Sequence, residues 1–98
     1  MPWIGFDFDG TLAKERTLEP VEPMMKRLRG YLEQGIEVRI LTARGNSEHE
    51  IQMVKRWLAA QGLPALEVTN RKDYQMIYLY DDRARQVIPN TGIVVGED

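Results

Sequence analysis

The chain has 98 residues, no cysteine and a formal net charge of −2, with 43% hydrophobic and 29% charged residues. These values are typical of one soluble globular domain over residues 1–98, exclude disulfides and cysteine-ligated metal sites, and give no indication of a strongly basic nucleic-acid-binding surface. No apolar run approaches the roughly 20 residues of a membrane span, and the first residues lack a signal-peptide pattern, so we expect a cytoplasmic protein without a membrane partner.

The first third of the chain predicts a strand, a loop and a helix. Residues 3–6 are short and apolar, which predicts a strand that ends near Asp7. Residues 9–19 are polar and predict a loop. Residues 20–35 predict a helix, because the segment opens with prolines, closes at Gly35 and carries apolar residues at helical spacing: Met25, Leu28 and Leu32.

The rest of the chain predicts further strands around a second helix. Residues 36–41 predict a strand, and the capping-box pattern SEHE at 47–50 predicts the start of a helix. Three more strands are expected at 66–69, 76–80 and 93–95. Strands that alternate with helices favour a parallel sheet, so the expected fold class is α/β.

Polar residues follow four of the expected strands. In a parallel α/β sheet, ligands bind beyond the carboxyl ends of the strands. We therefore expect the side chains after these strands to lie at one edge of the sheet: Asp7 and Asp9, Thr42, Lys72, and Asp81 and Asp82.

These residue types suit phosphoryl transfer. Asp7 and Asp9 are two residues apart, so in extended backbone they face the same side. One carboxylate can attack phosphorus while the other moves protons. Lys72 and the Thr42 hydroxyl can bind phosphoryl oxygens, and Mg²⁺ would offset the repulsion between several carboxylates.

The pattern resembles the haloacid dehalogenase (HAD) superfamily of phosphohydrolases, in its short form without a cap domain. Four motifs of that superfamily have counterparts here, in the same order: Asp7-Phe8-Asp9-Gly10-Thr11 after an apolar strand, Thr42 after a second strand, Lys72 ahead of the fourth, and Asp81-Asp82 after the fourth. Together they span most of the chain.

The resemblance implies a role for each acidic residue. Asp7 would be the nucleophile that forms an aspartyl-phosphate, and Asp9 the general acid and base. Mg²⁺ would be bound by Asp7, the backbone carbonyl of Asp9 and the acidic pair, with Asp82 favoured as the direct ligand and Asp81 acting through water. The implied enzyme is a Mg²⁺-dependent phosphomonoesterase.

The resemblance also implies phosphate contacts and a fold. Phe8 and Gly10 would offer backbone N–H groups to the phosphate, and Thr42, Ala43 and Lys72 would complete its site. The implied fold is a Rossmann-like, three-layer domain with five parallel strands in the order 5-4-1-2-3.

The loops leave no room for a cap. Residues 10–19 and 70–76 are too few to form one, so we expect an open site. An open site is compatible with bulky or macromolecular phosphoesters, including nucleic acid as a substrate, and equally with a small substrate whose pocket is completed by another subunit of a homo-oligomer.

Other interpretations of these residues stay open. Lys72 can be a solvated loop charge beside Arg71, and Asp-Gly is a common turn pair. A phosphoryl-accepting receiver domain also combines acids, a threonine and a lysine, but its acid pair follows the first strand and its acceptor the third, whereas residues 66–69 contain no aspartate. A catalytically idle phosphate-binding module is a further alternative.

Overall fold

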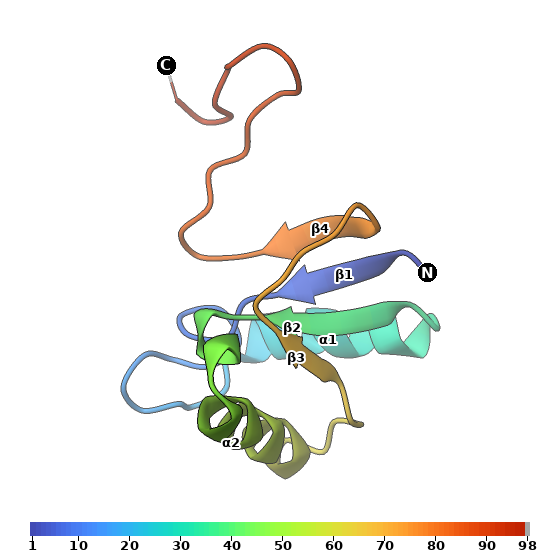
Figure 1. The fold of residues 1–98 in the computed structure, drawn as a ribbon, viewed down its shortest axis with the longest axis vertical. Coiled ribbons are helices and arrows are strands. Elements are labelled where there is room, and N and C mark those ends of the chain that lie inside the picture. The colour runs from blue at the N-terminus through green and yellow to red at the C-terminus, as the bar shows by residue number, and fades with distance from the viewer. Residues whose placement is uncertain (98) are drawn as a thin grey trace.

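The structure is a computed structural model that describes residues 1–97, with four strands, two α-helices and one short 3₁₀ helix among them (Figure 1). In chain order these are β1 (Trp3–Phe6), α1 (Glu22–Glu33), β2 (Glu37–Leu41), η1 (Ala43–Asn46), α2 (Glu48–Ala60), β3 (Glu67–Thr69) and β4 (Met76–Tyr80). None of the helices in this part of the chain is both long and apolar enough to cross a membrane.

The strands form one all-parallel sheet in the order β3-β2-β1-β4. The expected α/β class and parallel pairing are therefore confirmed. The expectation of five strands in the order 5-4-1-2-3 is wrong, because residues 93–95 do not join the sheet.

Local pairing accounts for the missing fifth strand. Residues 93–95 fold back through the turn at 89–92 onto residues 86–88, where the Ile88 N–H donates to the Ile93 carbonyl at 2.9 Å and an isolated antiparallel bridge joins the two segments. This pairing closes only a short loop, whereas a parallel neighbour of β4 requires a crossover, usually helical, and residues 81–97 contain no helix.

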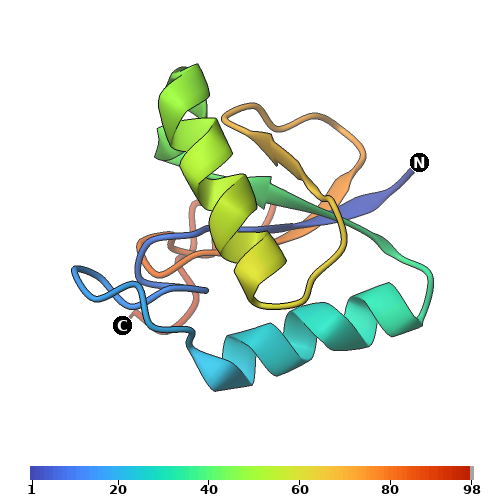
Figure 2. The same cartoon turned by 90° about the horizontal axis from the view of Figure 1, so that it is seen from below.

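Both α-helices cover the same face of the sheet, so the expected three-layer arrangement is also wrong. In Figure 2, which looks from the side of α2, α2 lies in front of the strands and α1 runs below them. One buried cluster joins alternate strand residues to one side of each helix: Ile4, Phe6, Val38, Ile40 and Val68 from the strands, Met25 and Leu28 from α1, and Val54 and Leu58 from α2.

The two helices begin where their sequences predict. Pro23 lies in the first turn of α1, where its fixed φ suits the helix and its missing N–H costs no hydrogen bond. The Ser47 hydroxyl accepts a hydrogen bond from the Glu50 N–H at 3.2 Å and so caps α2. Each helix then buries one apolar side against the sheet.

A connecting segment, residues 70–75, crosses the opposite face of the sheet, turns at 73–76 and joins β3 to β4 (Figure 1). Asp73 fixes this crossing segment, because its carboxylate accepts a hydrogen bond from Trp3 Nε1 at 2.8 Å and lies 3.4 Å from Arg39 Nη1. The Arg39 guanidinium also lies 4.6 Å from the centre of the Trp3 ring. Trp3 is thereby fully buried without a helix above it.

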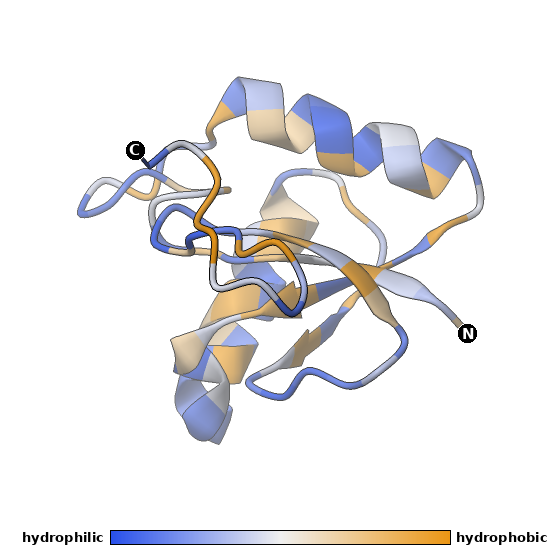
Figure 3. Ribbon diagram, turned by 90° about the horizontal axis from the view of Figure 1, so that it is seen from above, coloured by the Kyte–Doolittle hydropathy of each residue, from blue (hydrophilic) through white to orange (hydrophobic). Residues whose placement is uncertain are grey.

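The end of the chain packs differently. After β4 the chain leaves the sheet, and Figure 3 shows hydrophobic residues along this segment, away from the helices. Large apolar side chains are exposed from the crossing segment onward: Tyr74, Ile77, Tyr78, Val87, Ile88, Ile93 and Val95. Tyr78 stands in an apolar stretch of the sequence, which predicts a place in or near the core; this prediction is wrong, because its side chain is exposed.

Candidate active site

A cavity of about 600 Å³ opens at the carboxyl edge of the sheet, where all four strands end. Its lining comes from the segments that follow the strands and includes seven of the residues that the sequence predicts for a site: Asp7, Asp9, Thr42, Ala43, Lys72, Asp81 and Asp82. Glu15, Leu41, Asn70, Leu79 and Arg83 complete it. Phe8 and Gly10 are not part of the lining.

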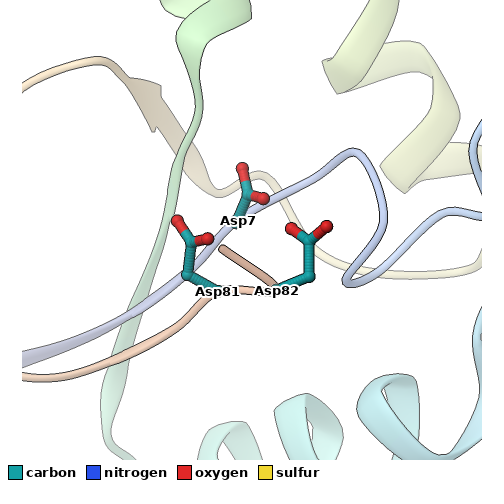
Figure 4. A group of neighbouring side chains, drawn as sticks. All are labelled: Asp7, Asp81 and Asp82. Carbon is teal, nitrogen blue, oxygen red and sulfur yellow. The ribbon is translucent and has the colours of Figure 1, made fainter. Parts of the chain in front are cut away.

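Three of these aspartates form a cluster, which we call the carboxylate cluster. Asp7 follows β1, and Asp81 and Asp82 follow β4; each offers an oxygen, and these oxygens lie within 4.8 Å of one another (Figure 4). Desolvation by burial, followed by the charges of Asp81 and Asp82, raises the pKa of Asp7 to about 7, although the Phe8 backbone N–H acts in the opposite direction. Asp7 therefore retains its proton at a pH where an exposed aspartate is ionised.

The carboxylate cluster fits a hard divalent cation. Three carboxylates supply oxygen ligands, which Mg²⁺ prefers, and their mutual repulsion falls when a cation lies between them. The side chain of Asp9 does not belong to this group. Of the predicted metal ligands, Asp7, Asp81 and Asp82 are brought together, whereas the Asp9 carboxylate has a different partner.

A tight turn after β1 positions Asp7 and Asp9. The Phe8 carbonyl accepts the backbone N–H groups of residues 11–13 at 3.0–3.2 Å, and the Phe8 ring is fully buried in the core. The ring packs edge-on against Trp57, with 5.1 Å between centroids. Because Phe8 points into the core, the carboxylates on either side of it both face the cavity.

Gly10 allows Asp82 to approach this turn. Its φ of +80° suits glycine, and a Cβ at this position would lie 2.5 Å from Asp82 Oδ2. Thr11 Oγ1 donates to Asp82 Oδ1 at 3.4 Å, which is a weak hydrogen bond. The Gly10 N–H, expected to face phosphate, donates to the Ala13 carbonyl at 2.8 Å. The glycine thus makes room for a carboxylate of the cluster.

Asp9 is paired with an arginine. Arg44 Nε lies 2.7 Å from Asp9 Oδ2 and Arg44 Nη2 lies 2.9 Å from Asp9 Oδ1, which is a bidentate contact. Arg44 Nη1 lies 2.7 Å from Glu50 Oε2. The hydrogen bonds that Arg44 donates to Asp9 and Glu50 raise the pKa of Arg44 above its ordinary value, so the guanidinium stays charged.

Thr42, Ala43 and Lys72 also line the cavity. Thr42 is 4% exposed, its N–H donates to the Thr69 carbonyl, and its hydroxyl caps η1 by accepting the Arg44 N–H at 3.1 Å. A hydroxyl that accepts one hydrogen bond can still donate its own proton to a ligand. Lys72 is exposed on the crossing segment, so its ammonium is available to an anion.

Sequence reasoning missed the part that Glu50 plays. The capping box assigns Glu50 to the start of α2, and its N–H does bond to Ser47, but its carboxylate contacts Arg44. Arg44 itself could be expected either to touch substrate or to form a surface ion pair, and it forms ion pairs with Asp9 and Glu50. No periodicity in the sequence gives a signal for contacts between η1, α2 and the β1 turn.

Comparison with known proteins adds no relative: no family, no curated protein and no solved structure matches this chain.

Proposed function

We propose that this protein is a Mg²⁺-dependent phosphomonoesterase of the HAD type, with Asp7 as nucleophile and Asp9 as general acid and base. One observation carries the proposal: carboxylates from β1 and β4 converge in a single cavity that also holds a hydroxyl and an ammonium group suited to phosphate. A phosphoryl-accepting signalling module and an idle phosphate-binding module remain the alternatives.

The reaction has two halves. In the first, an Asp7 carboxylate oxygen attacks phosphorus, the bond from phosphorus to the ester oxygen breaks, and Asp9 gives its proton to the departing alcohol. In the second, Asp9 takes a proton from water, the water oxygen attacks phosphorus, and the bond between phosphorus and Asp7 breaks. Phosphate leaves, and Asp9 carries a proton again, which now comes from the water.

The remaining residues support these steps. Lys72 and the Thr42 hydroxyl bind the non-bridging phosphoryl oxygens and orient the phosphate toward Asp7. Asp7, Asp81 and Asp82 would hold Mg²⁺, which supplies positive charge against the carboxylates and the phosphoryl oxygens. That charge also favours the ionised form of Asp7 that a nucleophile requires.

The site gives a broad expectation about substrates. The elements of residues 1–97 include no inserted domain between β1 and α1 or between β3 and β4 that could cover the cavity. The proposal therefore includes bulky phosphoesters, such as oligonucleotides with a terminal phosphate, as well as small ones whose pocket a second subunit completes. We expect it to act in the cytoplasm.

Hydrolysis of an aryl phosphate with and without Mg²⁺ tests the proposal. Wild-type protein should release phosphate only with the metal, and Asp7→Asn should lower the rate by at least about 1,000-fold, since the nucleophile is lost. Glu33→Gln, which removes an exposed carboxylate of α1, is the matched control and should retain full activity. Activity without metal, or an active Asp7→Asn variant, would contradict the mechanism.

A second measurement separates the alternatives. Trapping of the phosphorylated protein should show an intermediate that turns over within the catalytic cycle. A stable phosphorylated Asp7 without multiple turnovers would favour the signalling module, and no phosphorylation at all would favour the idle module. A panel of phosphorylated metabolites and of 3′- and 5′-phosphorylated oligonucleotides would then identify the substrate class.

A further inference from the structure

We propose that Arg44 is a positioning residue for Asp9, and that Glu50 in the first turn of α2 holds Arg44 in place. This inference rests on the proposed function, because it assigns Asp9 the task of moving protons. It adds two residues, outside the four motifs shared with the HAD superfamily, that act on the reaction through another side chain.

The contacts define how Asp9 is held. Arg44 uses all three guanidinium nitrogens, two on Asp9 and the third on Glu50, at 2.7–2.9 Å. The side chains are only 30–38% exposed, so solvent competes with these ion pairs less than it would at an open surface. A bidentate pair fixes the plane of the carboxylate as well as its distance.

Each end of this arrangement is itself anchored. The Thr42 hydroxyl caps the 3₁₀ helix that carries Arg44, and the Ser47 hydroxyl caps the helix that carries Glu50. The Arg44 guanidinium also lies 5.9 Å from the centre of the Phe8 ring, which the core immobilises. The position of the Asp9 carboxylate therefore depends on the starts of η1 and α2, through Arg44 and Glu50, as well as on the turn after β1.

The positioning has a chemical consequence. Arg44 holds Asp9 apart from the carboxylate cluster, whose oxygens lie within 4.8 Å of one another without it. A cation in the cluster would be bound by Asp7, Asp81 and Asp82, while the side chain of Asp9 stays on the cavity wall without being consumed as a metal ligand. Within the motif Asp7-Phe8-Asp9, Asp7 is therefore available as a metal ligand and Asp9 for proton transfer.

Direct phosphate binding by Arg44 is the competing explanation. Arg44 is not among the residues that line the cavity, whereas Asp9 is. Each of its nitrogens already lies next to a carboxylate oxygen. Arg44 is therefore expected to act through Asp9 and not on the substrate.

The test compares two substrates that differ in their need for an acid. The ratio of kcat/KM for an alkyl phosphate, glycerol 2-phosphate, to that for an aryl phosphate, p-nitrophenyl phosphate, is measured with Mg²⁺. Nitrophenolate departs without protonation, whereas the alkoxide requires a proton. Arg44→Gln should lower the alkyl-to-aryl ratio by about 10- to 100-fold, within the range that a positioned acid contributes.

Three further variants make the result specific. Arg44→Lys keeps the charge but not the bidentate contact and should recover part of the lost ratio. Glu50→Gln should shift the ratio in the same direction by about 2- to 5-fold, as expected for a weakened charge-assisted hydrogen bond. Arg56→Gln, which alters an exposed arginine of α2, should leave the ratio unchanged.

Each outcome supports or overturns the inference. An equal loss on both substrates, without rescue by lysine, would mean that Arg44 is merely structural. Weaker binding of inorganic phosphate to Arg44→Gln, with an unchanged ratio, would make Arg44 a phosphate ligand. A wild-type protein inactive on both substrates would overturn the proposed function and this inference together, whereas an active one whose ratio does not respond to Arg44→Gln would overturn this inference alone.

Discussion

Residues 3–69 and residues 76–97 use their apolar side chains in opposite ways. In the first region Phe6 and Leu28 are fully buried between the sheet and the helices, whereas in the second Ile77 and Tyr78 are more than half exposed. The strands of both regions belong to one parallel sheet. What differs is the helix that follows each strand: α1 follows β1 and α2 follows β2, but β4 is followed by irregular chain. In this architecture most apolar residues are buried where a helix covers the sheet, and Trp3, which the crossing segment covers on the other face, is the exception.

The carboxylate cluster lies across the boundary between the two regions. Asp7 comes from the helix-covered region, and Asp81 and Asp82 come from the first residues beyond β4. The buried region fixes one carboxylate, and the exposed region supplies the other two. Stability and site geometry therefore respond to different residues, which the following substitutions distinguish.

The largest contrast is expected between two aromatic truncations. Phe6→Ala should lower the free energy of unfolding by about 3–5 kcal/mol, because it leaves a cavity where the Phe6 ring stacks on Tyr80. Tyr78→Ala, on the neighbouring strand, should cost less than about 1.5 kcal/mol because its side chain is 61% exposed. Urea unfolding measures both. Equal losses would show that β4 contributes to the core as fully as β1 does.

A smaller loss of stability is expected from a substitution at Gly10, where the two regions meet. Gly10→Ala should cost about 1–2 kcal/mol, because alanine is strained at a φ of +80°. Its Cβ would also displace Asp82, so binding of Mg²⁺ should weaken more than the fold does. Titration calorimetry with Mg²⁺ and thermal unfolding separate the two effects. Gly35→Ala has a similar φ, with nothing within 4 Å of its Cβ, and serves as the control that should leave Mg²⁺ binding intact.

The next effect depends on pH. Because the pKa of Asp7 is raised to about 7 in the folded protein, the folded state binds this proton more tightly than the unfolded state, whose pKa is near 3.8. The stability of the metal-free protein should therefore fall as the pH rises from about 4 to about 7 and then level off. Asp7 is only partly buried, so the fall should be modest.

Asp7→Asn should remove this part of the pH dependence. Urea midpoints at pH 4.5 and pH 8, without divalent cations, measure it in both proteins. Asp73→Asn is the control, because its pKa is lowered, mainly by the hydrogen bond from Trp3, and its loss should not flatten the fall above pH 4.5. An unchanged slope in Asp7→Asn would show that Asp7 is not the group responsible.

The smallest effect is expected near the C-terminus. Ile93→Ser should change the free energy of unfolding by no more than about 0.5 kcal/mol, because its side chain is 56% exposed and lies outside the core. Val38→Ser on β2 is the matched substitution in the helix-covered region and should be clearly destabilising. A large loss from Ile93→Ser would show that residues 93–95 pack on the protein after all.

Much of the fold follows from patterns that the sequence carries locally. Apolar spacing and capping residues locate α1, α2 and the four observed strands to within a few residues, because each pattern reflects the burial of one side of one element. The rule that strand ends share one edge of a sheet then brings Asp7, Thr42 and Asp81 to one cavity.

Other features depend on which of several possible contacts is more favourable in the folded chain, and no local sequence pattern gives this. The β-branched residues at 93–95 suit a strand anywhere, and their pairing with 86–88 reflects the short loop at 89–92, not their own propensity. The contact between Arg44 and Asp9 depends on how η1 sits against the β1 turn. Such positions are set by packing of the whole chain.

The short length of the crossing segment restricts where Lys72 can lie. Residues 70–75 must travel from the end of β3 to the start of β4, across three strand spacings of about 4.8 Å each and back along the length of a strand. Seven peptide steps extend to at most about 25 Å, and the turn at 73–76 shortens that length, so the chain has little slack. The position of Lys72 in the cavity lining is therefore restricted by the short backbone on either side of it and by the hydrogen bond that Trp3 donates to Asp73, the next residue.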